Sequence, residues 1–146
     1  MKMLTLLPLF VIVTTIGCVQ KSEVFSTSSQ AIRGYDPVAY FTEGKPTKGI
    51  EKFVFNWKQA NWYFSSKENL DSFSNNPEKF APQYGGFCAF ACSNGRKAPT
   101  DPNAWAIIEG KLYLNKSLEI QEKWNQNQKE RIEQADKNWP LIKEKE

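Results

Sequence analysis

The sequence contains no histidine among its 146 residues, and it has only three cysteines. Histidine is the usual proton carrier near neutral pH, so its absence excludes Ser–His and Cys–His nucleophile pairs and nearly every catalytic zinc arrangement. A bound metal would have to be held by sulfur, carboxylate, phenol or backbone oxygen, which favours thiolate-loving ions such as Cu(I). We therefore expect no catalytic turnover, because no other constellation replaces the missing general acid–base residue.

The chain also lacks a strong excess of charge of either sign. The chain carries 19 basic and 16 acidic residues, for a formal net charge of +3, and lysine and glutamate alternate near the C-terminus. No basic stripe of the kind that nucleic acid requires is visible. We expect a solvated surface and no nucleic-acid partner.

The N-terminus has the pattern of an export signal. Lys2 is followed by the uncharged and largely apolar run MLTLLPLFVIVTTIG, and Cys18 comes directly after it. A basic start, an apolar stretch and small residues before the cut site are typical of a signal peptide, here 1–17. A cysteine at this place resembles the bacterial lipobox, which predicts lipidation of Cys18 and a lipoprotein anchored in a membrane and facing the periplasm. An ordinary signal peptide or an uncleaved anchor are the alternatives.

The rest of the chain predicts one small domain. Residues 18–30 are mostly small and polar and predict a tether after the lipidated cysteine, and residues 31–142 are long enough for a single core. The pair Asp36-Pro37 predicts a helix over 37–41, and the alternating segment 49–57 with the returning strand 62–64 predicts a hairpin.

The second half repeats these signals. Ser65 and Glu68 have the spacing of a capping box, and Asp101 with Pro102 repeats the Asp-Pro helix start. Glu109-Gly110 marks a second hairpin turn, and a polar helix is expected over 117–136, with Trp139 at its end before Pro140. The predicted class is α+β: a small antiparallel sheet of hairpins with short helices and a long C-terminal helix.

The segment YGGFCAFACSNG holds Cys88 and Cys92, four residues apart. One helical turn would point both sulfurs the same way, with Cβ atoms about 5–6 Å apart, and two thiolates can hold one Cu(I). A disulfide over so short a loop would be labile and redox-active. Cysteine also packs as a small hydrophobe, so both side chains could simply fill a core. All three interpretations stay open.

Other candidate site residues are aromatic or acidic. Asp36 and Asp101 could be paired carboxylates, although helix capping explains each. Aromatic side chains beside the glycine pair could line a pocket, although such residues often only pack. The pocket candidates are Tyr35, Asp36, Tyr84, Gly85, Gly86 and Phe87.

At GYDPVAYF, WYFSSKENLDSFSNNPEKFAPQYGGFCAF and DPNAWAIIEGKLYLN, the chain resembles the secreted bacterial branch of the YHS-domain family. The resemblance covers nearly the whole predicted domain and implies its fold. YHS domains are related to heavy-metal-associated modules beside copper-transporting ATPases. The positions that correspond to the thiols of the metal-linked members hold Ala39, Ser65 and Asn69, which are not soft-metal ligands.

These observations together predict an exported, lipid-anchored YHS-like domain that binds a soft metal, with copper as the candidate. Cys88 is the expected principal ligand and Cys92 the assisting one, and a metal donor or acceptor protein is the expected partner. The alternatives are a structural or interaction domain with buried cysteines and no metal, and a labile redox dithiol.

Overall fold

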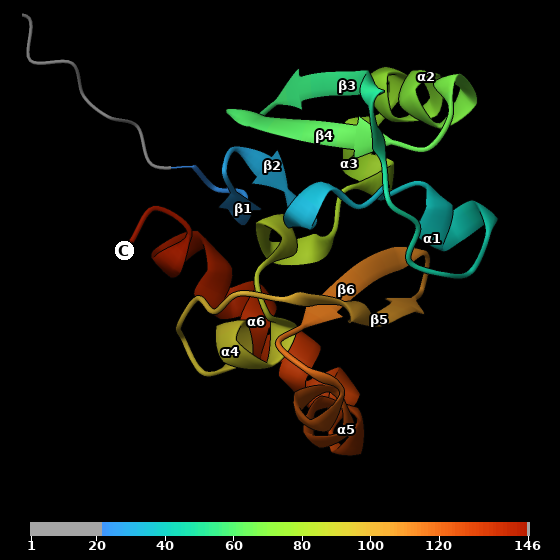
Figure 1. The fold of residues 1–146 in the computed structure, drawn as a ribbon. Coiled ribbons are helices and arrows are strands. Elements are labelled where there is room, and N and C mark those ends of the chain that lie inside the picture. Colours follow the sequence, from blue (N-terminus) through green and yellow to red (C-terminus); the bar gives the residue numbers. More distant parts are fainter. Residues whose placement is uncertain (1–21, 146) are drawn as a thin grey trace, which may run out of the picture.

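A computed structural model of the chain describes residues 22–145 (Figure 1). The predicted signal peptide and Cys18 lie outside the described residues. The elements in chain order are β1 (Ser26–Thr27), β2 (Gln30–Ala31), η1 (Ile32–Gly34), α1 (Ala39–Thr42), β3 (Ile50–Trp57), β4 (Ala60–Phe64), α2 (Lys67–Asn75), α3 (Pro77–Phe80), η2 (Gln83–Gly86), α4 (Ala89–Ser93), β5 (Asp101–Ile108), β6 (Lys111–Asn115), α5 (Leu118–Gln126) and α6 (Gln128–Ile142).

The predicted α+β class is confirmed. One sheet has the strand order β1-β2-β4-β3, and β5 pairs with β6 in a second sheet. All pairs are antiparallel except β2 with β4, which are parallel and in register at Gln30 and Asn61. Figure 1 shows the first sheet with α2 and α3 in one half of the molecule, and the β5–β6 hairpin with α4, α5 and α6 in the other.

Both predicted hairpins form with two-residue turns. Lys58 and Gln59 connect β3 to β4, and Glu109 and Gly110 connect β5 to β6. The four φ angles are positive, at 49° and 60° in the first turn and 50° and 73° in the second. Turns with two positive φ values match the right-handed twist of the paired strands, which explains how short connections close both hairpins.

Asp36 is fully buried and joins three elements. Its Oδ1 accepts hydrogen bonds from the backbone N–H groups of Val38, at 2.8 Å, and Ala39, at 3.2 Å, at the start of α1. Its Oδ2 accepts from the backbone N–H and the hydroxyl of Ser65, both at 2.8 Å, and from the Asn69 side-chain amide at 2.7 Å. Five donors therefore replace the water that a buried carboxylate loses.

The predicted N-cap of α2 is wrong by one residue. Ser66, and not Ser65, caps α2, because its side chain accepts a hydrogen bond from Asn69 N at 3.1 Å. The second Asp-Pro pair also differs from the prediction, because Asp101 begins strand β5 and no helix. Its Oδ1 accepts from Asn103 N at 2.9 Å in a local turn, and the apolar residues that follow pair with β6.

The single C-terminal helix predicted over 117–136 is two helices, α5 and α6. Asn127 separates them with φ −135° and ψ 47°, and asparagine is a weaker helix former than the glutamine, lysine and glutamate around it. The break lets Trp124 and Ala135, both fully buried, pack into one core. Pro140 does not end α6, which continues to Ile142, and Lys143 N donates to Trp139 O at 2.9 Å.

The residues before 31 belong partly to the folded domain. Val24 and Phe25 are buried, and β1 and β2 add to the first sheet, so the folded part begins inside the predicted tether 18–30. Phe25 N donates to Gly85 O at 2.8 Å, and Ile32 N donates to Phe25 O at 3.1 Å. The prediction of a tether rested on the mostly polar composition of residues 18–30, which did not indicate that Val24 and Phe25 are buried.

Two hydrophobic clusters form the interior. The first joins the four-stranded sheet, α2 and strand β6, and it centres on Trp62, Phe64 and Phe73, whose rings are fully buried. The second lies under α6 and contains Cys92 and Trp124. Within residues 22–145, no helix combines the length and the apolar character that crossing a bilayer demands.

We predict that Asp36→Asn lowers the free energy of unfolding by about 2–4 kcal/mol, because a side-chain N–H would face donors from Ser65 and Asn69. Urea denaturation measures the change. Asp101→Asn is the matched control: its oxygen can still accept from Asn103, so we expect a loss below about 1 kcal/mol. Equal losses in the two variants would contradict the central role of Asp36.

Candidate functional site

Cys88 and Cys92 lie at the two ends of one helical turn, the arrangement on which the metal interpretation depended. Cys88 is the N-cap of α4, and Cys92 N donates to Cys88 O at 2.9 Å. Both thiols are free, and both residues are buried, with exposed fractions of 1% and 0%. The two cysteines are therefore buried within one short segment of the chain.

The surroundings of Cys92 favour its protonated thiol. Burial, and then the charge of the neighbouring Cys88, raises the pKa of Cys92 to about 12. The Cys88 Sγ lies 3.6 Å from Asn115 Oδ1, to which it can donate a weak hydrogen bond. The same oxygen accepts from Phe90 N at 3.1 Å, which fixes the orientation of the Asn115 amide.

Two buried N–H donors near these elements have no acceptor. Within the described part of the chain, Asn115 Nδ2 and Trp124 Nε1 are the buried side-chain nitrogen or oxygen atoms without a hydrogen-bond partner. Trp124 packs in the same cluster as Cys92. The side-chain oxygen of Asn115, Oδ1, contacts the Cys88 sulfur. This interior has donors in excess and would stabilise added negative charge.

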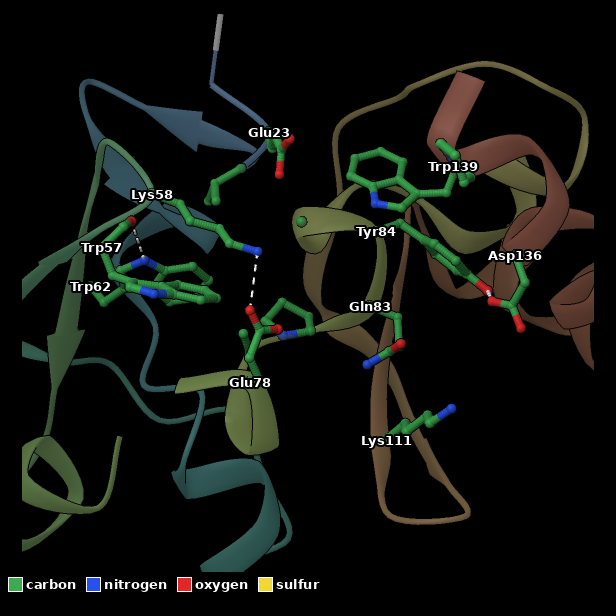
Figure 2. Close-up of a pocket in the computed structure, with 15 residues that line it drawn as sticks. Glu23, Trp57, Lys58, Trp62, Glu78, Gln83, Tyr84, Lys111, Asp136 and Trp139 are labelled. Carbon is green, nitrogen blue, oxygen red and sulfur yellow. Dashed lines mark hydrogen bonds and ion pairs between the residues drawn. The ribbon is translucent and has the colours of Figure 1, made fainter. Parts of the chain in front are cut away.

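The structure also contains a cavity of about 380 Å³ that the sequence did not predict (Figure 2). The N-terminal segment, the β3–β4 turn, α3, η2, β6 and α6 all contribute to its walls. Figure 2 shows Trp57 and Trp62 on one side and Trp139, Tyr84 and Asp136 on the other. The lining residues are Glu23, Val24, Trp57, Lys58, Trp62, Glu78, Ala81, Pro82, Gln83, Tyr84, Gly85, Lys111, Asp136, Trp139 and Pro140.

The Tyr84-Gly85 pair forms part of the cavity wall. Both residues have positive φ, 57° and 61°, and a Cβ on Gly85 would lie 1.7 Å from the Glu23 carbonyl oxygen. Only glycine lets the N-terminal segment pack so closely here. The Tyr84 hydroxyl donates to Asp136 Oδ1 at 2.9 Å, and burial, followed by this hydrogen bond, raises the pKa of Tyr84.

The structure separates the predicted pocket residues. Tyr84 and Gly85 line the cavity, but Asp36 lies away from it and connects α1 with α2. Tyr35 packs against the first cluster, and Lys48 Nζ lies 4.8 Å from the centre of its ring. Gly86 and Phe87 also lie outside the lining. Gly86 O accepts from Thr100 Oγ1 at 2.8 Å, and the Phe87 ring stacks between those of Phe25 and Trp139.

Sequence reasoning missed most of the cavity. The side chains come from three separate elements and one turn, and no local pattern connects them: Trp57, Lys58, Glu78, Asp136 and Trp139. The richness in tryptophan was the one available signal, but core packing explains that composition equally well.

The chain matches no protein-family model, and no curated protein and no solved structure matches it either. Among the described residues, no three histidine, cysteine or acidic side chains are grouped so that they could hold a metal ion. The similarity to YHS domains and its metal chemistry therefore stay predictions.

We predict that Cys88 and Cys92 react with a thiol reagent at least about a hundredfold more slowly in the native protein than in denaturant, because both side chains are buried and burial also raises the pKa of Cys92. Mass spectrometry after timed labelling at pH about 8 measures the rates. Glu122→Cys, at an exposed position, is the control and should label rapidly in the folded state. Rapid labelling of Cys92 in the native protein would contradict this prediction, and so would a higher number of reactive thiols after treatment with a reductant.

Proposed function

We propose that this protein is an exported, lipid-anchored domain that binds a soft metal ion, with Cu(I) as the candidate, and that it has no catalytic turnover. Cys88 is the principal ligand and Cys92 the second. Lipidated Cys18 attaches the chain to a membrane facing the periplasm, and a metal donor or acceptor protein is its partner. The similarity to YHS domains supports the metal class.

One observation carries the proposal: two free thiols share one helical turn. Two-coordinate Cu(I) accepts a pair of thiolates, and thiolates prefer this ion over harder divalent metals. The turn supplies the pair from a single element, so metal binding does not have to bring distant segments together.

The charge of such a complex fits the interior. Two thiolates and one Cu(I) carry one net negative charge, and the N–H groups of Asn115 and Trp124 are buried donors without acceptors. Donors of this kind around a metal–thiolate group tune its stability. Because the metal must displace protons, and the pKa of Cys92 is raised to about 12, affinity should increase as the pH rises.

Burial of the same thiols favours a second candidate, a structural or interaction domain without a metal. Exposed fractions of 1% and 0% are typical of cysteines that fill a core. A metal could enter this site only after α4 moves away from α6, so loading should be slow. A labile redox dithiol is the remaining alternative, and the two free thiols would be its reduced form.

We predict that Cu(I) binds the Cys18→Ser chain with one high-affinity site that Cys88→Ser or Cys92→Ser weakens by at least about tenfold. Competition against a Cu(I) chelator of known affinity measures the change. Ser93→Ala, next to Cys92 on α4, is the matched control and should retain the affinity. Equal copper affinity in all variants would exclude the thiol site and leave the metal-free domain.

We predict that Cys18→Ser moves the protein from the membrane fraction to the soluble fraction, because each buried acyl methylene contributes about 0.8 kcal/mol to attachment. Fractionation with immunodetection, and mass analysis for the acyl groups, provide the measurement. Cys88→Ser should stay with the membrane. Unchanged membrane attachment of Cys18→Ser would mean that another segment anchors the chain.

A further inference from the structure

The cavity already holds a cation that belongs to the protein. Lys58 Nζ lies 4.5 Å from the centre of the Trp57 ring and 3.2 Å from Glu78 Oε1. Figure 2 shows the Lys58 side chain extending over the paired indoles of Trp57 and Trp62 toward Glu78. An aromatic face combined with a carboxylate is the arrangement that binds ammonium groups in proteins.

The position of Lys58 in the chain is unusual for a lysine. It occupies the first residue of the β3–β4 turn with φ 49°, where asparagine, aspartate or glycine is preferred. The turn geometry directs its side chain back over Trp57. A residue held in a disfavoured backbone region at a cavity points to a use for its side chain there.

The Lys58–Glu78 pair can be replaced without loss to the fold. Its side chains are 41% and 74% exposed, so water screens the ion pair and it contributes little to stability. The Trp62 indole is held in place, because its Nε1 donates to Trp57 O at 3.1 Å and the side chain is fully buried. The aromatic surface is therefore preorganised, while its present cation can leave.

The remaining walls carry carboxylates as well as a second ammonium group, that of Lys111. Glu23, whose pKa is lowered mainly by its hydrogen bond to Lys143 and less by the charge of Lys58, lies at one edge of the cavity. Asp136 lies on the opposite side beside Tyr84, and it accepts a hydrogen bond from that hydroxyl with one of its two oxygens. Further carboxylates thus face the same cavity as the Trp57 and Trp139 indoles.

We propose that this cavity binds a small organic ammonium ion, whose cationic group takes the place of the Lys58 ammonium against Trp57 and Glu78. The volume of about 380 Å³ is in the range of small-molecule sites. Lys58 then acts as an internal competitor. This site is independent of the two thiols and goes beyond soft-metal binding.

Titration with choline and with ethanolamine, followed by tryptophan fluorescence and calorimetry, tests the proposal. Lys58→Gln should tighten binding by roughly fivefold because the competitor is gone, and Glu78→Gln should weaken it by roughly fivefold. Lys111→Gln is the matched control: it removes the same charge from the same cavity, away from Trp57, and should change affinity by less than about twofold.

The sign of the Lys58→Gln effect distinguishes the ligand classes. An anionic ligand such as acetate would bind more weakly to this variant, and that result, or equal effects of Lys58→Gln and Lys111→Gln, would overturn the proposal. Failure of both amines to bind any variant would overturn it as well. Cys88→Ser and Cys92→Ser should bind choline normally, so the soft-metal proposal can fail while this one holds.

A second arm identifies the source of the ammonium group. Phosphatidylcholine vesicles are added to the Cys18→Ser chain, which lacks the predicted anchor. Sedimentation with the vesicles that depends on Glu78 would indicate lipid headgroups, and binding of choline alone would indicate a free amine. Either result supports an ammonium site. If neither result is obtained, the proposal is overturned.

Discussion

The buried Asp36 carboxylate is the interaction on which the first half of the fold depends. Its two oxygens receive five hydrogen bonds from the start of α1, the end of β4 and the first turn of α2. Salt bridges among the described residues do not include it, so directed N–H and O–H groups alone compensate its charge. Ser65 and Asn69 supply three of these five hydrogen bonds.

The two halves of the molecule meet along the N-terminal segment. Phe25 pairs with Gly85, and Glu23 Oε1 lies 2.8 Å from Lys143 Nζ at the end of α6. The cavity lies along this seam, so its walls come from both halves and its shape depends on the close approach at Gly85. Cys92 lies in the second cluster, and the Cys88 thiol contacts the Asn115 side chain.

Local signals predicted the elements best. Both hairpins, the helix start at Asp36 and the helical turn between Cys88 and Cys92 follow from short patterns of residues that contact each other. The wrong predictions occurred where tertiary contacts override such patterns. Asp101 has the same dipeptide as Asp36, but pairing with β6 keeps it in a strand. The C-terminal helix breaks at Asn127 because both of its parts pack on one core.

The sequence by itself determined the α+β class, the thiol spacing and the exclusion of histidine chemistry, because each depends on composition or on neighbours along the chain. Tertiary structure alone decided that the thiols are buried and that Asp36 binds Ser65 and Asn69. It also decided that an ammonium group lies against an indole at the seam. Burial and proximity between distant segments arise from packing the whole chain, and no local pattern encodes them.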